Sequence, residues 1–129
     1  MKLLLFVSAG GAIGAALRFM TYQFFAAALA RGLMPFPWGT LTVNILGSFL
    51  MGLAVVIIGE RLGGSPEARA FFMTGILGGY TTFSAFSLDA MELYLNRSPE
   101  LVAVYVLGSV TVSIAALLAG FWIARWLLT

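Results

Sequence analysis

The sequence contains no cysteine and no histidine. Without cysteine the chain can form no disulfide framework and offers no thiolate nucleophile. Without histidine it lacks the commonest metal ligand and the side chain that most often acts as a general base near neutral pH. These two absences exclude most metal sites. They also leave no nucleophile–base pair of the usual kinds, so we do not expect an enzyme.

Charged side chains are also scarce. They make up 9% of the 129 residues, whereas a soluble domain carries about a quarter. The seven basic residues are scattered and the net charge is only +2, so nothing indicates a nucleic-acid partner. Hydrophobic residues account for 61% and the mean hydropathy is +1.03, more apolar surface than water can solvate on so short a chain. We therefore expect one integral membrane domain over residues 1–129, with the lipid bilayer as its solvent.

Long apolar runs fill most of the chain, and a helix needs about 20 such residues to cross a bilayer. Clusters of helix-breaking residues divide the chain into four apolar segments. The segments are residues 3–30, 39–58, 67–96 and 101–128. The sequence thus predicts an all-α fold of four transmembrane helices.

Local signals support two of these helix starts and leave one alternative open. Ser65 and Ser98 each precede a proline and a glutamate, an order that favours the first turn of a helix. The run that follows Lys2 could alternatively be a signal peptide. The apolar character resumes after Arg18, which favours a membrane span.

The loop charges give only a weak orientation. With four spans, one side of the membrane holds four basic residues and the other holds two (Lys2, Arg61, Arg69 and Arg125 against Arg31 and Arg97). Because lysine and arginine in the loops set orientation, so small a bias allows insertion both ways. Two copies in opposite orientations could then pair as a homodimer.

Two narrow polar stripes run along otherwise apolar spans. Tyr105, Ser109 and Ser113 are spaced by four residues and share one helix face, as do Thr40 and Asn44. A hydroxyl can bond back to its own helix, so any single serine needs no further explanation. Asn44 cannot satisfy its amide in that way. We interpret the combined stripes as a polar pathway.

The third span contains a helix-weakening segment, GGYTT at residues 78–82. A helix broken here exposes backbone groups that a bilayer tolerates only where they line a cavity or bind an ion. We predict a break at mid-membrane, a new helix near Thr82, and free carbonyls before it that could hold a cation. The alternative is an unbroken helix whose glycines, Gly75 and Gly79, allow close packing. Gly10 and Gly14 mark a similar contact face on the first span.

The remaining polar groups favour an anion. Phe83 and Phe86 follow the break on one helix face, and phenylalanine ring edges are positive. Arg18 either attracts anions at the mouth of a pathway or bonds carbonyls of a neighbouring helix. Asp89 is the single deep titratable candidate and has no evident partner in the sequence. A donor-lined route without a deep base indicates passive anion passage.

Three segments resemble the motifs of the bacterial Fluc (CrcB) fluoride channels: GGAIGAALR at 10–18, GTLTVNILGSF at 39–49 and GGYTTFSAF at 78–86. The resemblance covers nearly the whole chain. It implies a dual-topology antiparallel homodimer in the bacterial cytoplasmic (inner) membrane, with two pores that export cytoplasmic fluoride. Ala85 departs from the threonine or serine frequent in the family, and Asp89 stands where glutamate is common.

The resemblance also implies residue roles. Asn44 becomes a pore donor, Phe83 and Phe86 become rings that line fluoride, and Arg18 is the basic residue near the wide vestibule. The backbone carbonyls of Gly78 and Thr81 would hold a structural sodium ion at the dimer interface. The full expected ion pathway comprises Arg18, Thr40, Asn44, Phe83, Ser84, Phe86, Tyr105, Ser109 and Ser113.

Two other kinds of membrane protein remain as alternatives. A small dual-topology multidrug exporter would need a deep carboxylate in its first helix, and the first span has none. A non-transporting helical subunit of a larger complex would leave Asn44 and the serines as contacts between helices.

Overall fold

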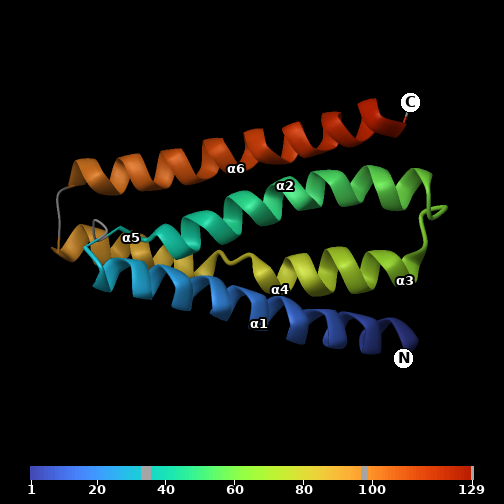
Figure 1. The fold of residues 1–129 in the computed structure, drawn as a ribbon, viewed down its shortest axis with the longest axis horizontal. Coiled ribbons are helices and arrows are strands. Elements are labelled where there is room, and N and C mark those ends of the chain that lie inside the picture. Colours follow the sequence, from blue (N-terminus) through green and yellow to red (C-terminus); the bar gives the residue numbers. More distant parts are fainter. Residues whose placement is uncertain (33–35, 97–98, 129) are drawn as a thin grey trace.

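The computed structural model describes residues 1–32, 36–96 and 99–128. Over these residues every regular element is a helix and no strand occurs. Three helices are long, namely α1 (Lys2–Ala30), α2 (Trp38–Glu60) and α6 (Pro99–Leu128). The remaining segment is divided into α3 (Pro66–Ala68), a π-helical stretch η1 (Arg69–Leu77), α4 (Gly78–Tyr80) and α5 (Ser84–Asn96) (Figure 1).

These bounds lie within two residues of the four predicted segments. Within the described residues, α1, α2 and α6 are long and apolar enough to cross a membrane. The Ser65 hydroxyl accepts a hydrogen bond from the Ala68 N–H at 3.2 Å, which confirms the predicted cap. Ser98, predicted as a second cap, and Arg97, counted among the loop charges, lie outside the described residues. A π-helical stretch was not predicted.

The helices lie alongside one another, with both termini at the same end (Figure 1). α2 and α6 run in the same direction and make the largest contact between helices. On the other side of the bundle, α1 packs against η1 and α4. The protein is therefore two tightly packed helix pairs joined along their length.

Glycines bring the helices within each pair into close contact. A Cβ added at Gly10 or Gly14 of α1 would collide with the backbone of η1, at the carbonyl oxygens of Phe71 and Ile76. The structure thus confirms the predicted contact face of the first span and identifies its partner. Between α2 and α6, a Cβ at Gly52 would collide with the Leu117 carbonyl oxygen in the same way.

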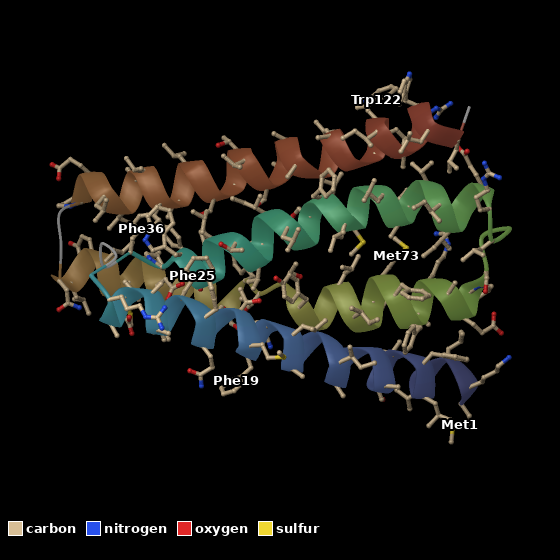
Figure 2. The ribbon with its side chains drawn as sticks, viewed as in Figure 1. Met1, Phe19, Phe25, Phe36, Met73 and Trp122 are labelled. Carbon is tan, nitrogen blue, oxygen red and sulfur yellow. The ribbon has the colours of Figure 1, made fainter. Side chains whose placement is uncertain are left out.

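The outer surface is strongly apolar. Large hydrophobic side chains such as Phe19 and Trp122 point away from the bundle (Figure 2) and are mostly exposed. A small buried cluster contains Phe86, Leu93 and Tyr105. An exterior of this kind suits a hydrocarbon environment, as the composition predicts.

The predicted helix break is present. The chain leaves α4 after Tyr80, Thr81 adopts an extended conformation (φ −78°, ψ 162°), and α5 begins at Ser84. The Thr82 hydroxyl accepts a hydrogen bond from the Ala85 N–H at 3.2 Å and so caps the new helix, as predicted. The alternative of an unbroken helix is wrong, although Gly79 does pack against the backbone of α1 as that alternative required.

Candidate functional site

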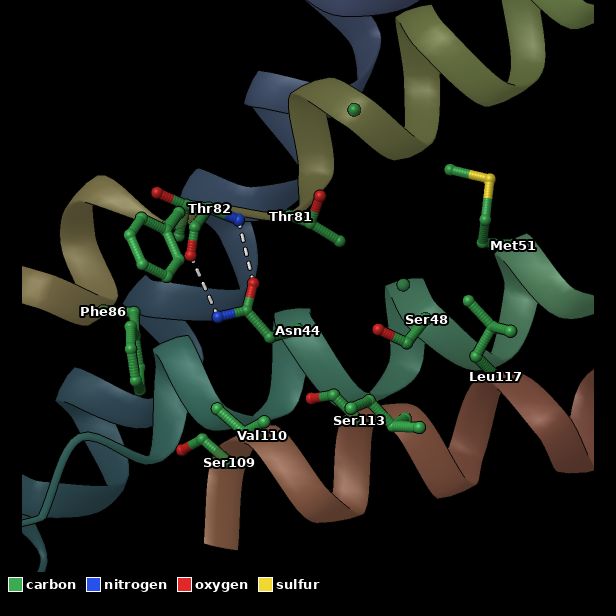
Figure 3. Close-up of a pocket in the computed structure, with 14 residues that line it drawn as sticks. Asn44, Ser48, Met51, Thr81, Thr82, Phe86, Ser109, Val110, Ser113 and Leu117 are labelled. Atoms are coloured by element: carbon green, nitrogen blue, oxygen red, sulfur yellow. Dashed lines mark hydrogen bonds between the residues drawn. The ribbon is translucent and has the colours of Figure 1, made fainter. Parts of the chain in front are cut away.

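Asn44 of α2 holds the break from one side. Its Nδ2 donates to the Thr82 carbonyl at 3.0 Å, and its Oδ1 accepts the Thr82 N–H at 2.8 Å (Figure 3). This pair of bonds replaces the helical partners that Thr82 loses. The Thr82 N–H is therefore not used to close a helical turn onto the Gly78 carbonyl. As expected, the Asn44 amide is satisfied away from its own helix, and one Nδ2 hydrogen is left over.

Arg18 of α1 holds the break from the other side. Its Nη1 donates to the Thr81 carbonyl at 3.0 Å. The Thr81 hydroxyl donates to the Leu77 carbonyl at 2.9 Å, so its own side chain faces the preceding helix. Of the two interpretations of Arg18, the bond to a carbonyl of a neighbouring helix is the geometry observed. Arg18 does not line the pocket described next.

A pocket of about 480 Å3 lies between α2, the break and α6. We call it the central pocket. It brings together seven of the predicted site residues: Asn44, Gly78, Thr81, Phe83, Phe86, Ser109 and Ser113. Among the residues that the structure describes, no carboxylate and no basic side chain lines it. The polar groups that face it are therefore neutral.

Aromatic rings lie at one end of the central pocket. The rings of Phe83 and Phe86 have centroids 5.5 Å apart, and Phe86 is followed by Tyr105 at 5.3 Å. Phe86 is buried, whereas Phe83 is 78% exposed on the open side of the pocket. The sequence correctly placed the two phenylalanines on one face, and the structure adds Tyr105 to the same row of rings.

Tyr105, Thr40 and Ser84 lie outside the lining of the central pocket. Tyr105 is 1% exposed and its hydroxyl donates to Asp89 Oδ2 at 3.1 Å. No partner for Asp89 was evident in the sequence, and α6 supplies one from sixteen residues away. The buried Thr40 hydroxyl lies 3.2 Å from that of Tyr22. Ser84 is exposed, with its hydroxyl 3.3 Å from that of Thr82.

The carboxylates face a different cavity. Asp89 and Glu92 line a smaller pocket of about 280 Å3 together with Phe36 and Asn96. Tyr105 and Phe86 pack in the core between this cavity and the central pocket. Donors and acids are thus separated, with the donors in the larger space.

The serine hydroxyls of α6 that line the central pocket differ from the hydroxyls elsewhere. Outside it, Thr21, Ser87 and Thr111 each donate to the backbone carbonyl four residues earlier, at 3.0, 2.9 and 2.7 Å. Ser109 is 4% exposed and its hydroxyl has no partner. Within the described residues, Ser113 likewise makes no hydrogen bond. Back-bonding to the helix therefore explains the outer hydroxyls, and that of Thr81, but it does not explain the hydroxyls of Ser109 and Ser113.

Ser48 is a pocket residue that the sequence interpretation missed. It lines the central pocket from α2, four residues after Asn44, and its side chain is labelled beside that of Ser113 in Figure 3. The spacing of four that selected Thr40 and Asn44 continues to Ser48, so the signal was present in the sequence.

The carbonyls predicted to hold sodium can be tested against this geometry. Gly78 and Thr81 both line the central pocket, and Gly78 is exposed. Backbone carbonyl oxygens are suitable ligands for hard cations, and within the described chain no cluster of three or more acidic side chains offers an alternative site. The Thr81 carbonyl already accepts the Arg18 guanidinium and keeps its second lone pair. The two carbonyl oxygens therefore fit a cation, although the positive charge of Arg18 repels it.

The chain is also similar to known proteins over nearly its whole length. The chain matches the family described as CrcB-like protein, Camphor Resistance (CrcB), over residues 5–121. It is 48% identical over 119 residues to a protein of Agrobacterium fabrum, an alignment covering 92% of this chain and 93% of the relative. It is 46% identical over 125 residues to a protein of Rhizobium meliloti, covering 97% and 98%. A third relative, from Mesorhizobium japonicum, is 50% identical over 123 residues and 95% of both chains.

All three relatives carry the name fluoride-specific ion channel FluC. Both the matched range and the coverage extend over nearly the whole chain, so the likeness is not confined to one helix. This chain is a multi-pass protein of the bacterial inner membrane and belongs to the CrcB family.

Proposed function

We propose that the protein is a passive fluoride channel that exports cytoplasmic fluoride and so gives resistance to its toxicity. The observation that carries this proposal is the central pocket, where unpaired hydroxyls and one amide face a space with no carboxylate. Neutral donors of this kind can replace the water around a small anion. The relatives named as fluoride-specific channels support the choice of ion.

The donors divide into two groups. Asn44, Ser109 and Ser113 line the pocket, and each can offer a hydrogen toward its centre. Tyr105 and Thr40 extend the same helix faces toward the carboxylates, so the polar track continues through the core beyond the aromatic rings. Ser84 remains a pathway residue only if a second copy places it at a shared opening. Arg18 would add positive charge near the same vestibule.

Phe83 and Phe86 would line the fluoride pathway with their ring edges. The rings are tilted at 40° to one another, so their edges and faces are not equivalent toward the pocket. A ring edge carries partial positive charge and costs no charged side chain. A cation would prefer the ring faces, and the absence of an acid from the pocket lining also favours an anion.

A second copy would complete the channel. The central pocket opens on the side where Phe83 is largely exposed and Gly78 is uncovered. The segment 66–96 would form the fourth span, with its break at mid-membrane. An antiparallel dual-topology homodimer would cover the open side twice and give two pores. The weak charge bias of the loops supports insertion in both orientations.

In such a dimer the Gly78 and Thr81 carbonyls of both copies would hold the structural sodium ion. The ion would supply a fixed positive charge that neutralises the exposed carbonyl dipoles. Within one chain, Arg18 and Asn44 already hold the break, so the dimer contact rather than the break itself would depend on sodium.

Reconstituted liposomes test the proposal directly. Purified protein should release fluoride, followed with a fluoride-selective electrode, and should not release chloride under the same gradient. Equal release of both anions, or release of neither, would contradict the proposed function. A multidrug exporter would instead show proton-coupled uptake of a cationic dye.

A further inference from the structure

The order of polar residues along α2 and α6 follows from a close contact of the two helices at Gly52. A Cβ at Gly52 would meet the Leu117 carbonyl and the Phe121 nitrogen, so Gly52 sits between those two residues of α6. The helices run parallel (Figure 1), and one turn back along each adds about four residues. Ser48 therefore lies between Ser113 and Leu117.

A further turn back places Asn44 between Ser109 and Ser113. The four polar side chains thus alternate between the two helices in the order Ser109, Asn44, Ser113, Ser48. Figure 3 shows these labelled residues in the same order. We call these four residues the donor row.

Ser48 has a free hydroxyl at the end of the donor row. It is half-buried and lines the central pocket. Within the described residues its hydroxyl makes no hydrogen bond, not even the ordinary bond to the carbonyl four residues earlier. Ser113 behaves in the same way, and the buried Ser109 hydroxyl is unpartnered. Three neighbouring serines with unused donors indicate a common ligand in the pocket.

Beyond Ser48 the pocket lining becomes apolar. Met51 is the next lining residue of α2, and Ile114 and Leu117 follow Ser113 on α6. An anion that passes Ser48 in this direction finds no further neutral donor on either helix of the lining. The Ser48 hydroxyl is therefore the last one available before the ion must regain water.

We propose that Ser48 coordinates fluoride together with Ser113, as the terminal binding position of the donor row. The proposal rests on the proposed function, and it adds a residue and a position to that pathway. The ligand class is a small hard anion, because two neutral hydroxyls can donate to it at modest cost. Ser48 touches the ion directly and does not act through another residue.

Removing one oxygen tests this assignment. Ser48→Ala should slow fluoride efflux from liposomes about tenfold, because a hydrogen bond to a charged partner is lost. Thr111→Val is the matched control, since its hydroxyl lies on α6 outside the pocket and bonds its own helix. That variant should conduct as the unmodified protein does. Size-exclusion chromatography of both variants verifies that the assembly is intact.

The chain has no cysteine, so a single introduced thiol can be modified alone. Ser48→Cys keeps the size of the side chain. Silver ions should bind its sulfur, with loss of the thiol proton, and stop fluoride efflux. Silver should leave Thr111→Cys and the unmodified protein conducting. This second arm decides the assignment even if Ser48→Ala does not assemble.

The two proposals fail in different ways. Unmodified protein that passes no fluoride would overturn the proposed function. Unmodified protein that conducts, with Ser48→Ala at the same rate or Ser48→Cys insensitive to silver, would overturn only the assignment of Ser48.

Discussion

Replacing Asn44 tests how the helix break is held. Asn44→Ala removes both hydrogen bonds to Thr82, at 3.0 and 2.8 Å, and leaves the N–H and the carbonyl of Thr82 without those partners. A net hydrogen bond contributes about 0.5–1.5 kcal/mol in soluble proteins, and polar contacts between membrane helices average about 0.6 kcal/mol. Two bonds therefore predict a loss of about 1–3 kcal/mol in the free energy of unfolding.

The same change should alter the shape of the pocket. With Asn44 gone, the Thr82 N–H becomes free to bond the Gly78 carbonyl, four residues earlier, as in a continuous helix. Closing that turn would move the start of α5 and the Phe83 ring. We expect fluoride efflux to fall with stability, since a pore donor is also lost.

Reversible unfolding in mixed detergent micelles measures the free energy, and electrode recordings measure efflux. Asn96→Ala is a matched control, because the Asn96 amide bonds the Glu92 carbonyl of its own helix at 3.0 Å and is exposed. The control should lose little. If Asn44→Ala unfolds with the same free energy as Asn96→Ala, the break is not held by this amide and the reasoning is refuted.

Three further predictions concern the pore and its assembly. Phe83→Ile should slow fluoride efflux strongly while the dimer still forms, because an aliphatic group lacks a positive edge; unchanged efflux would remove the ring from the pathway. Arg18→Gln should lower the sodium concentration at which the stabilisation of the dimer in thermal melts is half complete. A guanidinium about 5 Å from a cation repels it by about 3 kcal/mol at an effective dielectric constant of about 20. An unchanged midpoint concentration would show that Arg18 does not act on the cation site. Single cysteines introduced at either terminus should label from both sides of the membrane, and labelling from one side alone would eliminate the antiparallel dimer.

Much of the helical architecture could be predicted because its signals are local. Apolar runs and breaker clusters gave helix bounds to within two residues. The break needed only the glycine pair and Thr82, since weak helix formers followed by a good capping residue end one helix and begin another. The Gly10 and Gly14 contact face was equally visible, but its partner η1 was not, because a small-residue face does not specify what packs on it.

The pairings between distant residues could not be predicted. Arg18 reaches Thr81, Asn44 reaches Thr82 and Tyr105 reaches Asp89, and each depends on which helices become neighbours. Sequence spacing places residues on one face of a helix, but it does not specify which residues of a neighbouring helix that face contacts. Ser48 is different, because it shares the spacing of Thr40 and Asn44 and needed no tertiary information.

The fold is linked to transport by which polar groups are hydrogen-bonded within the chain and which are not. The backbone groups freed at the break are taken up within the chain by Asn44 and Arg18. The serine hydroxyls of the central pocket are left unused, even where back-bonding to the helix would be the cheapest option. In hydrocarbon an unsatisfied hydrogen-bond donor is costly. This sequence satisfies the backbone groups at the break but leaves the hydroxyls of Ser48, Ser109 and Ser113 unpaired. The cost therefore falls where a dehydrated anion can relieve it by accepting those hydrogens. This asymmetry favours a route for an ion over mere contacts between helices, which would have paired the serines instead.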